Sequence, residues 1–124
     1  MRQISINRRS NRILYNVTVS VDAAIFQQWL GFIRTDHIPK IISTGCFSGY
    51  KICKMLDESG DNHTVAVQYF ADSVEDFEQY QKQFAAPLQK EYIQKFGSSA
   101  PAFRSVLHAL EEGEVVSNNE PSKN

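Results

Sequence analysis

Residues 13–21 alternate strictly between large apolar side chains and smaller, mostly polar ones. One side of the extended chain would carry Ile13, Tyr15, Val17, Val19 and Val21, and the other side Leu14, Asn16, Thr18 and Ser20. A period of two with many β-branched residues is typical of a strand that buries one face. Such a strand is not stable alone, so the chain must supply partner strands and a layer that covers the apolar face.

A helical pattern follows this strand. Asp22 is a candidate N-cap, and apolar residues recur at helical spacing at Ile25, Trp29, Phe32 and Ile33. We predict a helix to about residue 36 and a break at residues 37–39, because proline disfavours helical backbone in the residue before it. Gly45 is predicted to close one further turn in the left-handed conformation.

The rest of the body alternates between the same two patterns. Residues 46–56 and 63–71 are predicted to be strands joined by a polar hairpin loop at 57–62. Ser73 begins a capping box for a second helix that runs to Phe96, and Pro87 should kink or split that helix. Residues 101–110 are predicted to be the last strand, with Phe103 and Leu107 on one face. Its other face would carry Arg104, Val106 and His108.

This order, βαββαβ, predicts an α+β fold of the ferredoxin-like type, in which a four-stranded antiparallel sheet carries two helices on one face. Right-handed crossovers would place the first and third strands in the middle. The second sheet face combines apolar and polar residues. We expect it either to pack against the sheet of another subunit or to serve as a platform for an extended ligand.

The 124 residues carry 13 basic and 14 acidic side chains, but the charges are unevenly distributed. Residues 1–12 hold four arginines and no acid, whereas residues 111–124 hold four glutamates and one lysine. We predict a basic flexible extension at 1–12, a single domain at 13–110 and an acidic, disordered tail at 111–124. The mildly acidic body lacks an RNA-recognition motif, so nucleic acid is not an expected partner. No apolar run is long enough to span a membrane.

The two cysteines, Cys46 and Cys53, do not form a metal-binding pattern with any histidine. If both lie on one strand, they are about 23 Å apart and cannot pair with each other. Unpaired thiols indicate a reducing compartment, and we expect a cytoplasmic protein. We predict neither a metal nor a cofactor.

Several segments resemble a known family. These segments are residues 15–19, the helix that contains Trp29, the run from residue 37 to 47, residues 67–69 and residues 102–104. They resemble an uncharacterised bacterial domain-of-unknown-function family. That family is similar to the dimeric α/β-barrel proteins, which include antibiotic-biosynthesis monooxygenases and ethyl-tert-butyl-ether-degradation-type proteins. The resemblance covers residues 13–110 and implies a homodimer formed through the sheet face, with a ligand cavity. It implies no reaction.

His37 is the candidate catalytic residue. The resemblance implies that a histidine just after the first helix faces the cavity, where it can act as a general base or anchor a ligand. At a helix C-terminus the helix dipole would favour its protonated form. The alternative is a structural role, in which His37 bonds the last carbonyls and fixes the bend at Pro39.

Four polar residues are candidate ligand contacts because we expect them to converge on the second sheet face: Asn16, Thr18, Gln68 and Arg104. The guanidinium of Arg104 can bind a carboxylate or phosphate through two hydrogen bonds. The same four residues can instead lie in a dimer interface. The predicted function is therefore binding of a small organic ligand by a dimer, with enzymatic activity left open, and the alternative is a non-catalytic dimerisation or interaction module.

Overall fold

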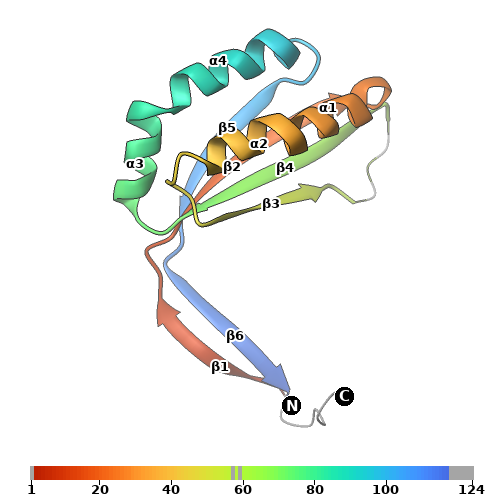
Figure 1. Ribbon diagram of the computed structural model, residues 1–124. Helices are drawn as coiled ribbons and strands as arrows, with labels where there is room; N and C mark the ends of the chain where they lie inside the picture. The colour runs from red at the N-terminus through yellow and green to blue at the C-terminus, as the bar shows by residue number, and fades with distance from the viewer. Residues whose placement is uncertain (1, 57, 59, 118–124) are drawn as a thin grey trace.

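The computed structural model describes residues 2–56, 58 and 60–117. Its main body is an antiparallel sheet of four strands in the order β3–β4–β2–β5, covered on one face by helices (Figure 1). The strands are β2 (Ile13–Asp22), β3 (Gly49–Lys54), β4 (Asn62–Ala71) and β5 (Ala102–His108). The α+β class and the antiparallel sheet are confirmed. Among the described residues, no helix has the length and apolar character needed to cross a membrane.

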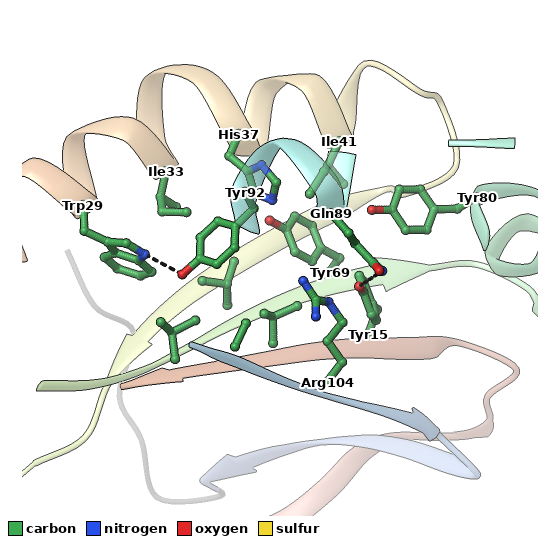
Figure 2. A pocket seen from close by; sticks show the side chains of 14 residues that line it. Tyr15, Trp29, Ile33, His37, Ile41, Tyr69, Tyr80, Gln89, Tyr92 and Arg104 are labelled. Atoms are coloured by element: carbon green, nitrogen blue, oxygen red, sulfur yellow. Dashed lines mark hydrogen bonds between the residues drawn. The ribbon is translucent and has the colours of Figure 1, made fainter. Parts of the chain in front are cut away.

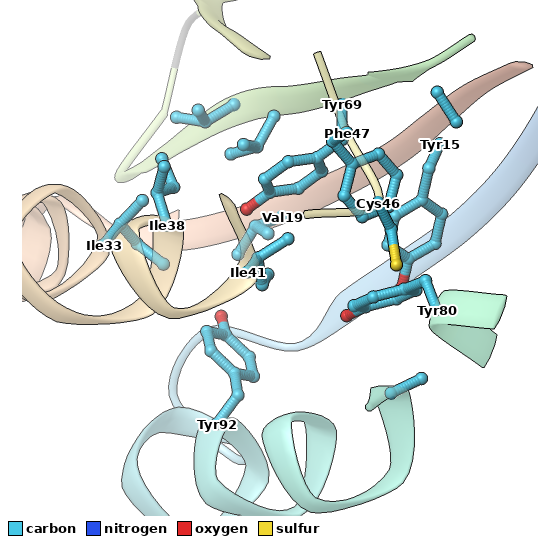
Figure 3. Close-up of a cluster of buried hydrophobic side chains, with 14 of the residues drawn as sticks. Tyr15, Val19, Ile33, Ile38, Ile41, Cys46, Phe47, Tyr69, Tyr80 and Tyr92 are labelled. Atoms are coloured by element: carbon cyan, nitrogen blue, oxygen red, sulfur yellow. The ribbon is translucent and has the colours of Figure 1, made fainter. Parts of the chain in front are cut away.

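The two central strands are β2 and β4, which agrees with the expected place of the first and third strands. They pair without interruption from Ile13 opposite Ala71 to Asp22 opposite Asn62. Their inward side chains, Val19, Val65 and Tyr69 among them, form the core with residues from the helices (Figure 3). The ring of Tyr15 lies at the centre of an aromatic cluster, with ring centroids 5.4–6.2 Å from those of Phe47, Tyr69, Phe77 and Tyr80.

The first helical segment is continuous from residue 23 to residue 42, so the predicted break at residues 37–39 is wrong. It consists of a short 3₁₀ turn (Ala23–Ile25), α1 (Phe26–Phe32), a π-helical turn (Ile33–His37) and α2 (Ile38–Ile42). Pro39 lies at the start of α2, directly after the π turn. In a regular α-helix its ring would clash with the carbonyl four residues earlier, and the wider π turn removes that conflict. Gly45 follows with a φ of 80°, as predicted.

The second helical segment is split, as Pro87 predicts. It consists of α3 (Val74–Gln83) and α4 (Ala85–Phe96), and the two meet at Phe84. Pro87 has no N–H to bond the carbonyl of Gln83, the last residue of α3, and its ring would clash with that carbonyl in a continuous helix. After the break, α4 runs beside the edge strand β5 on the helix-covered face of the sheet (Figure 1).

Ser73 is the N-cap of α3, because its hydroxyl accepts a hydrogen bond from the backbone N–H of Asp76 at 3.1 Å. We expect Ser73→Ala to lower the free energy of unfolding by about 1 kcal/mol, since the N–H loses its partner. Urea denaturation measures this change. Ser73→Asp is the matched control and should stay close to the wild-type protein, because aspartate also caps; an equal loss in both variants would contradict the capping role.

The two ends of the chain pair with each other. We expected no regular element there, but β1 (Arg2–Arg9) and β6 (Glu111–Ser117) form a two-stranded antiparallel sheet outside the body (Figure 1). Met1 and residues 118–124 lie outside the described residues. Arg9 pairs with Glu111 in the register, and Arg12 Nε lies 3.1 Å from a carboxylate oxygen of Glu112. The opposite charges of the two ends therefore face each other, a pairing across about a hundred residues that a local pattern does not reveal.

Candidate functional site

A pocket lies between the helical layer and the sheet, and we call it the helix–sheet pocket (Figure 2). Its cavity volume is about 20 Å³, enough for about one water molecule, and the figure rises to about 390 Å³ only when crevices and the solvent at its mouth are included. It is lined by residues from β2, β4, β5 and all the helices except the first 3₁₀ turn: Tyr15, Val17, Val19, Trp29, Ile33, His37, Ile41, Val67, Tyr69, Tyr80, Gln89, Tyr92, Ala102 and Arg104. Two of these, His37 and Arg104, are candidate site residues from the sequence, and the fold brings them to one cavity.

Arg104 lies on the helix-covered face of the sheet, which corrects the prediction for β5. The register places it opposite Val17, an inward-facing residue of β2. Phe103 and Leu107 therefore point to the opposite face, where they are 70% and 51% exposed. The two faces of this strand were assigned in reverse because the larger apolar residues were expected inside. In Figure 2 the side chain of Arg104 rises from β5 towards the helices.

The guanidinium of Arg104 has no compensating charge in the pocket. Its Nε is buried and has no hydrogen-bond partner. Among the residues that the structure describes, no carboxylate forms an ion pair with it, and none of the pocket's lining residues is acidic. Arginine stays protonated in proteins, so the pocket carries one fixed positive charge. The residue as a whole is half-buried, and Nε is the part of it that is fully buried; a buried N–H is usually hydrogen-bonded.

His37 reaches the pocket from the end of the π turn (Figure 2). Its ring centroid lies 5.8 Å from that of Phe32 and 5.5 Å from that of Tyr92. Its Nδ1 is buried and has no hydrogen-bond partner. Burial lowers the pKa of His37, and the charge of Arg104 acts in the same direction against the nearby carboxylate of Glu91. The expected preference for the protonated form is therefore wrong: the helix continues past His37, and the dominant effect is desolvation.

Tyrosine hydroxyls, the indole N–H of Trp29 and the amide of Gln89 supply the remaining side-chain polar groups of the pocket. Trp29 Nε1 donates to the hydroxyl of Tyr92 at 3.0 Å, and that hydroxyl in turn donates to the backbone carbonyl of Ala100. Burial raises the pKa values of Tyr69, Tyr80 and Tyr92, so these phenols are neutral at physiological pH. Gln89 Nε2 donates to the hydroxyl of Tyr15 at 3.4 Å.

The other three predicted contacts lie on the opposite side of the sheet, apart from Arg104. Asn16, Thr18 and Gln68 share the uncovered face, because their strand neighbours Val17, Val19 and Val67 point inward. Asn16 Nδ2 donates to the hydroxyl of Thr18 at 3.1 Å and lies 3.4 Å from that of Ser105. The expected convergence of all four residues is therefore wrong, and these three do not contact the pocket.

The sequence analysis missed the pocket's aromatic and amide lining. Trp29 and Tyr92 were taken as apolar positions of helices, Tyr69 was placed with Val65 and Val67 on one strand face, and Tyr80 was not singled out. The signal available was the type of side chain: three tyrosines in positions that leucine or valine fills in a dry core. A buried tyrosine hydroxyl needs a hydrogen-bond partner, which indicates a polar cavity beside it.

The described residues contain no cluster of three or more histidine, cysteine, aspartate or glutamate side chains that could hold a metal ion. Cys46 is buried in the loop before β3 and Cys53 is exposed on β3, and both are free. The assumption that both cysteines lie on one strand is therefore wrong. The helix–sheet pocket instead offers one cation, one neutral imidazole and several phenols, which are groups that bind and orient an organic molecule.

Comparison with known proteins adds a family and a fold. No curated protein matches the chain. A solved structure of a NipSnap family protein of unknown function from Agrobacterium tumefaciens is similar in fold, with a TM-score of 0.54 and 13% sequence identity. The match covers 85% of this chain and 95% of that one. The model of a domain of unknown function, DUF4286, matches residues 12–110, which include every residue of the pocket. The chain therefore belongs to the DUF4286 family.

Proposed function

We propose that this protein binds a small organic ligand in the helix–sheet pocket. The observation that carries the proposal is the pair of buried polar atoms, His37 Nδ1 and Arg104 Nε, which border the same cavity without a hydrogen-bond partner. Buried polar groups are almost always paired, and leaving one unpaired costs about 1–3 kcal/mol. A ligand that bonds both groups removes this cost. The two free thiols support a cytoplasmic location.

Binding is better supported than turnover. None of the lining residues is a serine, threonine or cysteine that could act as a nucleophile. His37 is the one lining side chain that can accept a proton near neutral pH, and its lowered pKa keeps it in the neutral form that a base requires. Among the described residues, none forms a hydrogen bond with its Nδ1, so we assign His37 to ligand binding.

A screen of small polar fragments tests the proposal. The chain contains a single tryptophan, and Trp29 lines the pocket, so the indole N–H resonance in NMR spectra reports binding there. We expect fragments that shift this resonance and that compete with one another. Ala102→Leu, which fills the pocket from β5, should weaken their binding at least tenfold. Ser105→Ala, on the opposite face of the same strand, is the matched control and should bind as the wild-type protein does.

Two outcomes would overturn the proposal that the pocket binds a ligand. The first is a diverse library with no fragment that shifts the Trp29 indole resonance. The second is binding that Ser105→Ala weakens as much as Ala102→Leu does. A loss of folding in Ala102→Leu would appear in its circular dichroism spectrum. In that case Val17→Ile, which fills the pocket from β2, is used as the pocket-filling variant instead.

We also propose that two copies of the chain pair through the uncovered sheet face, which we call the open face. It consists of Leu14, Asn16, Thr18 and Ser20 of β2, Gly49, Lys51 and Cys53 of β3, Thr64, Ala66, Gln68 and Phe70 of β4, and Phe103, Ser105 and Leu107 of β5. Lys51, opposite Gln68 on the edge strand β3, is the one charged side chain in this set, and Phe103 and Leu107 are largely exposed. A symmetric dimer places the same patch against itself, and the three strands β4, β2 and β5 contribute no charged side chain to this set, so repulsion between like charges is confined to Lys51 at the β3 edge.

Sedimentation velocity tests the dimer. We expect the wild-type protein to sediment as a dimer at micromolar concentration and Leu107→Glu to sediment as a monomer, because the substitution places two carboxylates in one interface. Val106→Glu, on the neighbouring exposed position of the helix-covered side, is the matched control and should leave the dimer intact. A monomeric wild-type protein would contradict this proposal and leave the pocket proposal unaffected.

A further inference from the structure

We infer that the ligand of the helix–sheet pocket is a small organic monoanion, a carboxylate whose head group pairs with Arg104 and whose apolar part lies among the aromatic side chains. The inference rests on the proposed function and names the class of ligand. It is drawn from the charges of the lining residues, the position of Arg104 at the sheet edge and the apolar walls behind it.

The side chains that line the pocket carry one fixed positive charge. Arg104 is the only lining residue with a fixed charge, and no lining residue among those the structure describes is acidic. The other ionisable lining side chains include the imidazole of His37 and the phenols of Tyr69, Tyr80 and Tyr92, which are neutral near pH 7 because burial disfavours their charged forms. A monoanion brings the total to zero. A neutral ligand leaves the guanidinium uncompensated, and a dianion leaves one negative charge buried, each at an energetic cost.

The donors near Arg104 suit a carboxylate. The guanidinium presents N–H groups in a planar fork that matches the two oxygens of a carboxylate. Its Nε is the buried atom that lacks a partner. The neutral phenols of Tyr69 and Tyr80 lie around the same cavity in Figure 2 and can donate to an oxygen that the guanidinium leaves free.

The position of Arg104 indicates how such a ligand would lie. β5 is an edge strand, and Arg104 borders two surface clefts beside α4 as well as the internal pocket. A charged head group at this position stays near the mouth. The deeper walls are apolar and include Val19, Ile33 and Ile41, and they favour a hydrocarbon or aromatic group. The cavity volume of about 20 Å³ is smaller than the apolar part of such an acid, so the ligand must be small and the wall side chains must move apart to admit it.

Binding of an anion to Arg104 is also expected to change the pKa of His37. The positive charge of Arg104 contributes to the lowered pKa of His37, opposed by the carboxylates of Glu91 and Asp36, while Lys40 acts in the same direction as Arg104. A bound carboxylate neutralises Arg104, so the pKa of His37 should rise when the ligand binds. By linkage, the same acid should bind more tightly as the pH falls towards the pKa of His37.

The test compares three probes of similar shape on the full-length protein: benzoate, the neutral benzamide and phenylphosphonate, which is mainly a dianion at pH 8. Dissociation constants come from NMR titrations of the Trp29 indole resonance at low salt. We expect benzoate to bind at least tenfold more tightly than either of the other probes. Arg104→Gln should weaken benzoate at least tenfold and change benzamide by less than twofold. Arg34→Gln, an exposed arginine on the π turn, is the matched control and should leave every constant unchanged.

The outcomes separate this inference from the proposed function. Benzamide or other neutral fragments binding as tightly as benzoate would overturn the monoanion inference while the ligand pocket stands. Preference for phenylphosphonate would overturn it in favour of a phosphate-type ligand. Failure of the whole fragment screen would overturn both. If Arg104→Gln does not fold, Arg104→Lys keeps the charge without the planar fork, and we expect it to retain the preference for benzoate over benzamide with a weaker affinity; loss of that preference would overturn the inference.

Discussion

Replacing Trp29 with alanine is expected to lower the free energy of unfolding by about 3–5 kcal/mol, the range measured for large aromatic residues in packed cores. The side chain is completely buried between α1 and the rest of the core, and its ring centroid lies 6.2 Å from that of Phe26. Its Nε1 donates a hydrogen bond to Tyr92, which connects α1 to α4. Alanine would remove both the volume and the connection between the two helical segments.

Urea denaturation followed by circular dichroism measures the effect, since fluorescence is lost with the only tryptophan. Trp29→Phe is the informative companion, because it keeps a ring and removes the hydrogen bond. We expect it to lose about 1–2 kcal/mol, mainly from the missing bond and the smaller volume. A loss below 1 kcal/mol for Trp29→Ala would contradict the tight packing of this helix against the core.

The second large effect is a loss of stability in mild acid that depends on His37. Burial lowers its pKa in the folded protein below the ordinary value of 6.5, so the folded state resists protonation. In the unfolded chain the imidazole takes up a proton as the pH falls below about 6.5. The unfolded state then binds more protons, and stability falls with decreasing pH by up to about 1.4 kcal/mol per pH unit. The loss ends below the pKa of the folded state, where both states are protonated.

Urea denaturation at a series of pH values from 7.5 to 5 measures this dependence. His37→Gln, which does not titrate, should remove the part of the slope that belongs to His37. Identical pH profiles for the wild-type protein and His37→Gln would show that His37 is not desolvated in the folded state.

Local patterns predicted the parts of the fold that depend on neighbouring residues. The alternation at residues 13–21 predicted β2 to within one residue, because burial of one strand face is recorded at every second position. Ser73 and Pro87 predicted the start of α3 and the split before α4 for equally local reasons, a missing backbone partner and a missing donor.

The parts that depend on distant residues could not be predicted in this way. The face on which Arg104 lies is decided by its register against Val17, about ninety residues earlier. Both faces of β5 carry apolar residues, so alternation alone cannot choose between them. The same limit applies to the pairing of β1 with β6. The continuous helix through Pro39 depends on a π turn, which has no simple sequence pattern.

The candidate site was therefore predicted only in part. His37 and Arg104 were selected from the sequence, but on different grounds and without the expectation that they line one pocket. Asn16, Thr18 and Gln68 were selected for their polarity on an alternating strand face and lie across the sheet from the pocket. Tyr92 was assigned to the core, which is correct for its buried ring. The structure adds that this residue also lines a cavity.

The most direct test of the ligand site is the side-chain Nε–H resonance of Arg104 in ¹⁵N-labelled protein, assigned by its loss in Arg104→Gln. Nε is the buried atom without a hydrogen-bond partner, so an anion bound in the pocket must change its resonance. We predict that added benzoate shifts this resonance and the Trp29 indole resonance with a single dissociation constant, and that benzamide at the same concentration leaves the Arg104 resonance in place. A benzoate titration that shifts the Trp29 resonance but not that of Arg104, or neither of them, would contradict the account.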